Sequence, residues 1–345
     1  MTTRQILIAL VLAIVIAAIG YNSGRFWAYL IYAVAIAGIG ALSLNLLIGF
    51  CGQITFAQGA LIGVGAYAGG ISGNAGWGAF SLLVAGVVTA LVSLVIGLPA
   101  LRLRGLYFAI STLAAQFILV YLFKILQPLT NGVSGLVVSP LSFFGRRIAS
   151  DQEYAVLCVA ILFLSWLFLS RITRTDVGRS FLVMRESELV ARGMGIDVSR
   201  TKMQAFLLSG FFSGICGALL AFTSRLANPE AFEIALSVDQ TAMIIVGGLG
   251  SFTGSIIGAA FVTLLPEIIE RLGAFFSAAS LLSAFREMAF GVLIILFLLL
   301  EPRGLVALLR RLGPRKTKKP AAVTDHANEV VKINSAASAR DGRST

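Results

Sequence analysis

Residues 26–49 read FWAYLIYAVAIAGIGALSLNLLIG and contain no charged side chain. A helix that crosses the hydrocarbon core of a membrane needs about 20 such residues, because each residue advances it by only about 1.5 Å. The whole chain has the same character: of its 345 residues, 58% are apolar and 12% are charged, and the mean hydropathy is +0.92. Water-soluble domains carry about twice that share of charge. The sequence therefore predicts a membrane protein without a sizeable aqueous domain.

Further apolar segments predict a bundle of about ten membrane-spanning helices. The expected fold class is all-α, a polytopic membrane helix bundle. The eighth and ninth segments are short and only the turn Gly247–Ser251 separates them, so they could also form one long kinked helix. The other segments lie near residues 5–20, 57–72, 78–101, 105–126, 153–170, 203–223, 236–248, 254–268 and 281–300.

Basic residues decide between the two counts, because lysine and arginine collect in the cytoplasmic loops of membrane proteins. With ten spans and both the N and C termini in the cytoplasm, most of the 27 basic residues fall on the inner side, above all at 171–202 and after 303. Joining the eighth and ninth segments into one crossing would place the basic C-terminal end outside. We therefore prefer ten spans.

The chain divides at about residue 312. Residues 1–312 form the predicted transmembrane domain, with a long cytoplasmic loop at 171–202. Residues 313–345 are polar and basic, and we expect this tail to be disordered. Its basic run favours a topology anchor, with contact to anionic membrane lipid as the alternative.

The motifs and charges exclude several mechanisms. No GxxxxGK[ST] phosphate loop occurs, so the chain is not expected to bind ATP by that route. We place the acidic residues at or beyond the ends of the spans, which does not favour coupling to protons or sodium. Ser237 and Gln240 have the spacing of a capping box, and we assign Asp239 beside them no functional role. Energy for any active transport would then come from a partner.

Metal and thiol chemistry are equally unsupported. The only histidine, His326, lies in the polar tail. Cys51, Cys158 and Cys216 lie far apart in apolar surroundings, and we interpret them as packing residues. We expect no metal site and no cofactor. An intramembrane enzyme would need clustered catalytic side chains or metal ligands at depth, which the sequence lacks.

The cytoplasmic loop predicts a short amphipathic helix over about 180–195. Glu188 and Arg192 follow in the order of a favourable i,i+4 ion pair. Gly195 stands where a C-cap glycine belongs, and Asp197 or Ser199 can cap the next span. Such a helix is either an ordinary interfacial helix or a surface for a partner protein. Its apolar face carries Val183, Val190, Ala191 and Met194, and its charged face Arg185, Glu188 and Arg192.

A family resemblance narrows these alternatives. Glu188-Leu-Val-Ala-Arg-Gly-Met-Gly195 resembles the E-x-x-A-x-x-x-G loop of bacterial ABC importer permeases, the EAA loop. The region from about 30 to 310 resembles, in order, the branched-chain amino acid permease family of the LivM type. The chain departs from that family at Ala57-Gln58, where Gly-His is frequent, and at Gln116, near which an acid is frequent. The matching stretches are Asn45–Phe50, Gly52–Phe56, Gly63–Tyr67, Leu101–Leu113, Thr130–Leu136, Gly247–Ser251 and Glu301–Leu305.

The resemblance implies a multi-pass permease subunit of an ABC importer for branched-chain amino acids in the cell inner membrane, not an enzyme. It implies alternating access in a dimer with a second permease subunit, driven by two cytoplasmic ATP-binding subunits and fed by a periplasmic solute-binding protein. Urea, short amides and other amino acids are alternative substrates, and a partner-independent secondary transporter or channel is the rival class. Nothing indicates nucleic acid. The implied ATPase-coupling residues are Arg185, Glu188, Ala191, Arg192 and Gly195.

Polar residues within the spans are candidates to line a translocation path. Each could instead join helices, because side-chain hydrogen bonds between membrane helices are common at roughly 0.6 kcal/mol. Gln53, Thr55 and Gln58 share a glycine-bracketed break between the second and third spans, where irregular backbone must be buried or line a cavity. The candidates are Asn45, Gln53, Thr55, Gln58, Ser111, Thr112 and Gln116.

Overall fold

The computed structural model describes residues 3–22, 24–103, 105–143, 146–148 and 150–274, together with residues 291 and 305. The predicted tenth span near 281–300 and the predicted tail at 313–345 lie outside the described residues. Two compact units divide the chain, Met1–Leu308 and Leu309–Thr345. The fold below is that of the first unit.

Nine helices of this unit coincide with the first nine predicted spans. Five of the described helices are long and apolar enough to cross a membrane by length and composition, the longest being Arg25–Phe50 and Val198–Ser224. The helices on the predicted spans are α1 (Thr3–Asn22), α2 (Arg25–Asn45) with the π-helical turn η1 (Leu46–Phe50), α3 (Gln58–Asn74), α4 (Phe80–Gly97), α5 (Leu106–Ile125), α7 (Asp151–Ile172), α10 (Val198–Ser224), α11 (Ile234–Gly247) and α12 (Phe252–Ala274).

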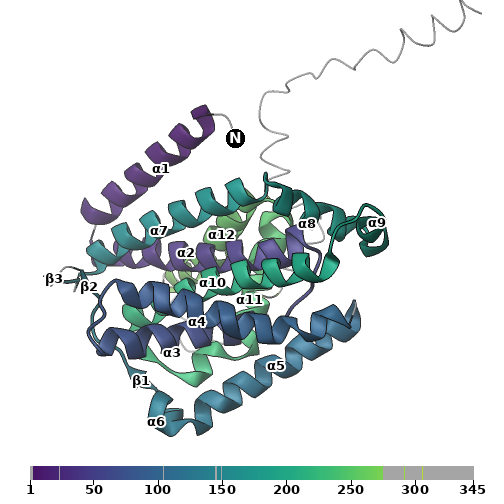
Figure 1. Ribbon diagram of the computed structural model, residues 1–345. Helices are drawn as coiled ribbons and strands as arrows, with labels where there is room; N and C mark the ends of the chain where they lie inside the picture. The colour runs from purple at the N-terminus through teal and green to yellow at the C-terminus, as the bar shows by residue number, and fades with distance from the viewer. Residues whose placement is uncertain are drawn as a thin grey trace, which may run out of the picture. The chain divides into compact units, whose positions relative to one another are not determined.

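Short elements close the two ends of the bundle (Figure 1). The α8–α9 end carries α8 (Asp176–Glu186) and α9 (Glu188–Gly193), and the opposite end, here called the strand end, carries small strand pairs. β1 (Leu136–Val137) pairs antiparallel with β4 (Leu226–Ala227), Leu136 opposite Ala227. The remaining elements are η2 (Pro99–Leu101), α6 (Gln127–Thr130), η3 (Gly132–Ser134), β2 (Ser142–Phe143), β3 (Arg146–Arg147), which pairs with β2, and η4 (Pro229–Phe232).

Helix α10 packs directly on α3 and α4 through small residues. A Cβ added at Gly65 of α3 would collide with the backbone of Gly214, and one at Gly217 would collide with the carbonyl of Ile62. Lipid offers no hydrophobic drive between helices, so such close backbone approach supplies the packing that holds them. Further along α3, a Cβ added at Gly73 would lie 2.7 Å from the ring of Phe222, which is fully buried on α10.

The eighth and ninth predicted spans are separate helices, not one kinked helix. Gly248 and Gly250 have φ values of 116° and 76°, which glycine alone adopts without strain. The chain therefore reverses after α11, and a Cβ at Gly247 would collide with the carbonyl of Gly254 in α12.

Two local predictions are wrong. The segment at 180–195 is not one helix, because Ser187 is extended (φ −163°, ψ 124°) and its Oγ accepts a hydrogen bond from Val190 N, which starts α9 anew. Ser187 therefore acts as an N-cap that interrupts the amphipathic pattern. The capping box at Ser237 and Gln240 also does not form, because α11 begins at Ile234, one turn earlier.

Candidate functional site

Residues 51–57 connect η1 to α3, and we refer to them as the break. Gln58, the first residue of α3, holds the end of the break in place. Its Nε2 donates to Ser43 Oγ (2.8 Å) and to the Gly40 carbonyl (3.2 Å), and its Oε1 accepts from Ser213 Oγ (3.3 Å). Gln58 is fully buried. One side chain thus joins the first residue of α3 to α2 and α10, which fixes where the break ends.

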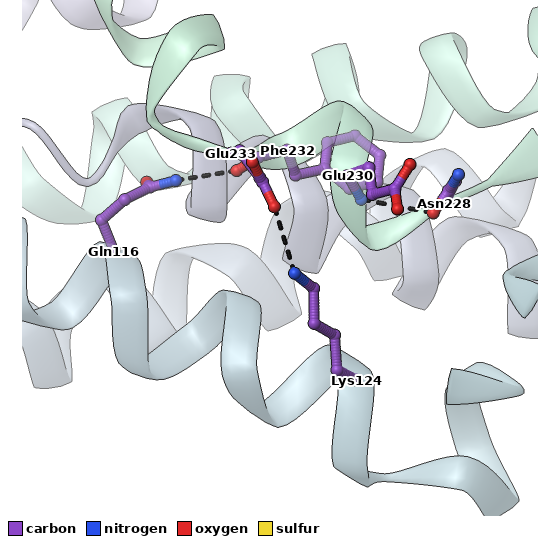
Figure 2. Close-up of polar contacts among 6 residues, drawn as sticks. All are labelled: Gln116, Lys124, Asn228, Glu230, Phe232 and Glu233. Carbon is purple, nitrogen blue, oxygen red and sulfur yellow. Dashed lines mark hydrogen bonds and ion pairs between the residues drawn. The ribbon is translucent and has the colours of Figure 1, made fainter. Parts of the chain in front are cut away.

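Gln116, in the middle of α5, joins the beginnings of two other helices. Its Oε1 accepts from Ala60 N (2.7 Å) at the start of α3, and its Nε2 donates to the Phe232 carbonyl (2.7 Å) just before α11 (Figure 2). Ser237 Oγ accepts from Gly59 N (2.7 Å) and contacts Gln116 Oε1 (3.4 Å). Because the first N–H groups of a helix lack intrahelical partners, Gln116 and Ser237 supply the acceptors that two of those groups in α3 need.

A groove of about 500 Å³ runs along α5 beside this junction. Its walls are mostly apolar, but at one end Lys124 Nζ lies 3.1 Å from Glu233 Oε1 (Figure 2). Both side chains of this ion pair are partly exposed, so the pair itself adds only about 0–1 kcal/mol of stability. Asn228 Oδ1 accepts from Glu230 N (3.2 Å) and caps η4, which carries the chain to Glu233. The groove thus combines apolar walls with one charge of each sign.

The other predicted path residues occupy different places. Asn45 donates to Ser255 Oγ (2.6 Å) and accepts from Gly250 N (2.9 Å), so it fastens α2 to the α11–α12 turn. Thr112 Oγ1 accepts from Phe56 N (3.1 Å) and so holds the break against α5. The structure therefore gathers Gln58, Thr112 and Gln116 around the break and places Asn45 at the α8–α9 end. Of the remaining three, Gln53 and Thr55 are buried within the break and Ser111 is half-buried on α5.

Helix α9 and the residues after it expose apolar side chains at the surface of the molecule. The exposed fractions of Leu189, Val190 and Met194 are 74%, 51% and 68%, and Arg192 and Gly195 beside them are exposed. We refer to these five residues as the α9 surface. The predicted apolar face is corrected in two respects: Val183 lies on α8 and not on the helix that carries Val190, and Ala191 is fully buried beneath that surface.

The predicted ion pair of Glu188 with Arg192 is replaced by another. Glu188 Oε1 lies 2.6 Å from Lys202 Nζ, and Lys202 in the first turn of α10 is only 2% exposed. The buried ammonium group of Lys202 needs a counter-charge, whereas the exposed guanidinium group of Arg192 is solvated. Glu188 therefore pairs with Lys202. Asp197 caps α10, its Oδ1 accepting from Arg200 N at 3.1 Å, and Gly195 adopts a φ of 79°. The α9 surface is therefore fastened to α10 through a buried pair.

Arg185, at the end of α8, connects this region to the break. Its Nη1 donates to the Gly49 carbonyl (2.5 Å) in η1, and a Cβ added at Gly250 would lie 2.9 Å from the same nitrogen. A Cβ at Gly52 would lie 3.2 Å from Arg185 Cα. Gly52 and Gly250, which lack a Cβ, thus allow the end of α8 to lie against both the break and the α11–α12 turn.

Asp239 lies further inside its helix than predicted from the sequence, where the acidic residues were placed at or beyond the ends of the spans. It lies inside α11, between Ile234 and Gly247, because that helix begins earlier than expected. The signal available in the sequence was a carboxylate inside an apolar run. Lys202, Ser43 and Ser213 were also missed, since nothing local distinguishes them from other polar residues, and Ser237 was assigned to a capping box and not to the junction at Gln116. Within the described part of the chain, no group of three or more histidine, cysteine or acidic residues could hold a metal ion.

Comparison with known proteins identifies transport permease proteins as relatives of this chain. The chain is 28% identical over 295 residues to the high-affinity branched-chain amino acid transport system permease protein LivM of Salmonella typhimurium, covering 78% of this chain and 67% of the relative. It is 25% identical to the probable LivM of Methanocaldococcus jannaschii, covering 86% and 88%. A more distant relative is the autoinducer 2 import system permease protein LsrC of Enterobacter sp., 26% identical over 63% of this chain and 64% of LsrC.

No solved structure matches the chain. The family model described as branched-chain amino acid transport system / permease component matches residues 26–300, which include the break, the junction at Gln116 and the α9 surface. The chain therefore belongs to the family of branched-chain amino acid transport system permease components.

Proposed function

We propose that this chain is a membrane-spanning subunit of an ABC importer for branched-chain amino acids in the cell inner membrane. It crosses the membrane ten times with both termini in the cytoplasm, and it pairs with a second permease subunit. Two cytoplasmic ATP-binding subunits supply the energy, and a periplasmic solute-binding protein delivers the substrate. Family membership and the LivM relatives support this proposal.

The single observation that carries it is the α9 surface. Exposed leucine, valine and methionine side chains at the end of a membrane bundle favour a protein partner, because a monomer gains nothing from leaving them in water. The buried pair of Glu188 and Lys202 attaches this surface rigidly to α10. A partner that moves α9 would therefore move α10, which packs against α2, α3 and α4.

Alternating access would follow from movement at the break. Arg185 joins α8 to η1, and the break then leads to Gln58 and to the junction at Gln116. Rigid-body motion at α8 and α9 would reach the middle of the membrane through these contacts. We place the path along α5 and the break, with Gln53, Thr55, Gln58, Ser111, Thr112 and Gln116 beside it and Asn45 holding its inner end.

Co-purification from cells expressing the whole transporter tests the docking surface. Leu189→Asp places a charge in the α9 surface, and we expect it to lower recovery of the ATP-binding subunits about tenfold, the effect of about 1.4 kcal/mol. Val137→Asp is the matched control, because Val137 is 69% exposed at the strand end. Equal recovery with both variants would contradict docking at α9, and ATP-independent transport by the chain alone would favour a secondary transporter.

A further inference from the structure

A second cavity, of about 330 Å³, lies between α2, α10 and α11. At the strand end it is bordered by Tyr29, near the start of α2, and by Thr223 and Ser224, at the end of α10. At its deep end it reaches Asp239 and Gln240 of α11. Binding pockets for small molecules are typically about 300–1,000 Å³, largely apolar, with a few polar groups, and this cavity has that form.

The deep end offers hydrogen-bond acceptors without donors to match them. Asp239 is half-buried, and within the described part of the chain no hydrogen bond or ion pair reaches its carboxylate. Gln240 is 3% exposed, and its Oε1 is buried without a hydrogen-bond partner among the described residues. Its amide is held against α2, since a Cβ added at Gly40 would lie 2.8 Å from Oε1. A buried acceptor left unpaired costs about 1–3 kcal/mol, so the pair of residues favours a ligand that donates.

The charge of the cavity specifies that ligand. Asp239 is the one charged residue among the described residues that line it, so the complementary group is a cation. A bare alkali ion would leave the apolar walls, which include Ile36, Leu220 and Met243, without a partner. A primary ammonium group attached to an aliphatic body satisfies both the acceptors and the walls.

We propose that this cavity binds an aliphatic amino acid by its ammonium group, with Asp239 as the counter-ion and Gln240 Oε1 accepting one of its N–H groups. The carboxylate of the amino acid then points toward the mouth, where the hydroxyl of Tyr29 can donate to it. The aliphatic side chain then lies against Ile36, Leu220 and Met243. The site rests on the proposed import function and adds a substrate position within this subunit. Entry is from the strand end, past Thr223.

Thiol labelling of the whole transporter complex tests the site without relying on transport. Thr223→Cys places a thiol at the mouth, and Ala75→Cys, in the exposed turn after α3, is the control. Cys51 and Cys158 are buried, but Cys216 lines the cavity itself, so both variants are made in a Cys216→Ala chain, and that chain without an added cysteine gives the background. Each complex, in nanodiscs without ethanolamine lipids, is treated with the cationic reagent 2-aminoethyl methanethiosulfonate or the anionic 2-sulfonatoethyl methanethiosulfonate.

We expect the cationic-to-anionic rate ratio to be about tenfold higher at Thr223→Cys than at Ala75→Cys, because a carboxylate nearby attracts the cation. Adding Asp239→Asn, which keeps the side-chain shape, removes that excess. We expect L-leucine to slow labelling at Thr223→Cys but not at Ala75→Cys. 2-Hydroxy-4-methylpentanoate, which lacks the ammonium group, should slow labelling at neither position. Gln240→Met raises the leucine concentration for half-protection about threefold to tenfold.

An unchanged ratio in the Asp239→Asn variant, or labelling that leucine does not slow, would overturn the proposal. Slowing by phosphatidylethanolamine but not by leucine would assign the cavity to a lipid headgroup and would also overturn it. ATP-driven uptake by the unmodified complex is measured in parallel. Its presence together with a failed labelling test rejects this site alone, whereas its absence rejects the proposed function.

Discussion

The guanidinium Nη1 of Arg185 lies 2.5 Å from the carbonyl oxygen of Gly49, although the two residues are 136 positions apart. Arg185 ends the helix next to the α9 surface, and Gly49 lies in the π-helical turn that precedes the break. This bond is a direct contact between the predicted coupling loop and the membrane part of the chain. It gives the proposed coupling role of Arg185 a specific form, in which the side chain would act through Gly49 rather than through solvent.

Arg185→Gln should therefore uncouple the transporter. The shorter side chain loses the charged hydrogen bond to Gly49, worth about 1.5–3 kcal/mol, while the α9 surface stays intact. We expect normal recovery of the ATP-binding subunits, retained ATP hydrolysis and leucine uptake per ATP reduced about fivefold to tenfold in proteoliposomes. Arg192→Gln is the control and should instead weaken subunit recovery. Full uptake per ATP in the Arg185 variant would remove this residue from the coupling route.

The pair of Glu188 and Lys202 predicts a different effect, on stability. Lys202→Ala removes the cation of this buried pair, and breaking a buried pair costs about 3–5 kcal/mol. We expect a strong loss of heat-resistant protein in detergent, measured as the fraction that remains soluble after heating. Glu188→Lys, by like-charge contact, should do the same, and the reversed pair Glu188→Lys/Lys202→Glu should recover much of the loss. Wild-type heat resistance in the single variants would show that the pair does not hold α9.

Gln116 is predicted to stabilise the fold in addition to its place beside the path. Gln116→Met leaves the Ala60 N–H and the Phe232 carbonyl without their side-chain partner, at about 1–3 kcal/mol for each buried group. The yield of folded protein in the membrane should fall. Phe117→Met, at the neighbouring exposed position on α5, is the control and should leave the yield unchanged. A normal yield with lost transport would assign Gln116 to the path alone.

The contact of Gly217 with Ile62 predicts an intolerance of any side chain. Gly217→Ala would drive its methyl group into the Ile62 carbonyl and separate α10 from α3. We expect loss of folded protein, seen as aggregation on size-exclusion chromatography. Gly193→Ala is the matched control, because a Cβ at Gly193 meets nothing within 4 Å. A monodisperse Gly217→Ala protein would contradict the close packing of these helices.

Sequence reasoning located the described helices well, because uninterrupted apolar runs of membrane length leave few alternatives. It failed where tertiary contacts decide. The early start of α11 was not predictable, because the contact between Gln116 and Ser237 at that start joins residues 121 positions apart. The interior position of Asp239 did have a local signal, a carboxylate inside an apolar run, which was not used. Likewise, Glu188 pairs with Lys202 and not with Arg192 because Lys202 is buried. Burial depends on the assembled fold, so the sequence alone did not indicate this pair.

Leucine uptake into proteoliposomes tests the central claim most directly. The chain is reconstituted with its second permease subunit, in one sample with the ATP-binding subunits and in the other without them, and binding protein and leucine are added outside. We predict accumulation against a gradient only when the ATP-binding subunits and ATP are both present, and its loss in the Leu189→Asp variant. Accumulation without those subunits, or undiminished accumulation by Leu189→Asp, would contradict a permease driven through the α9 surface.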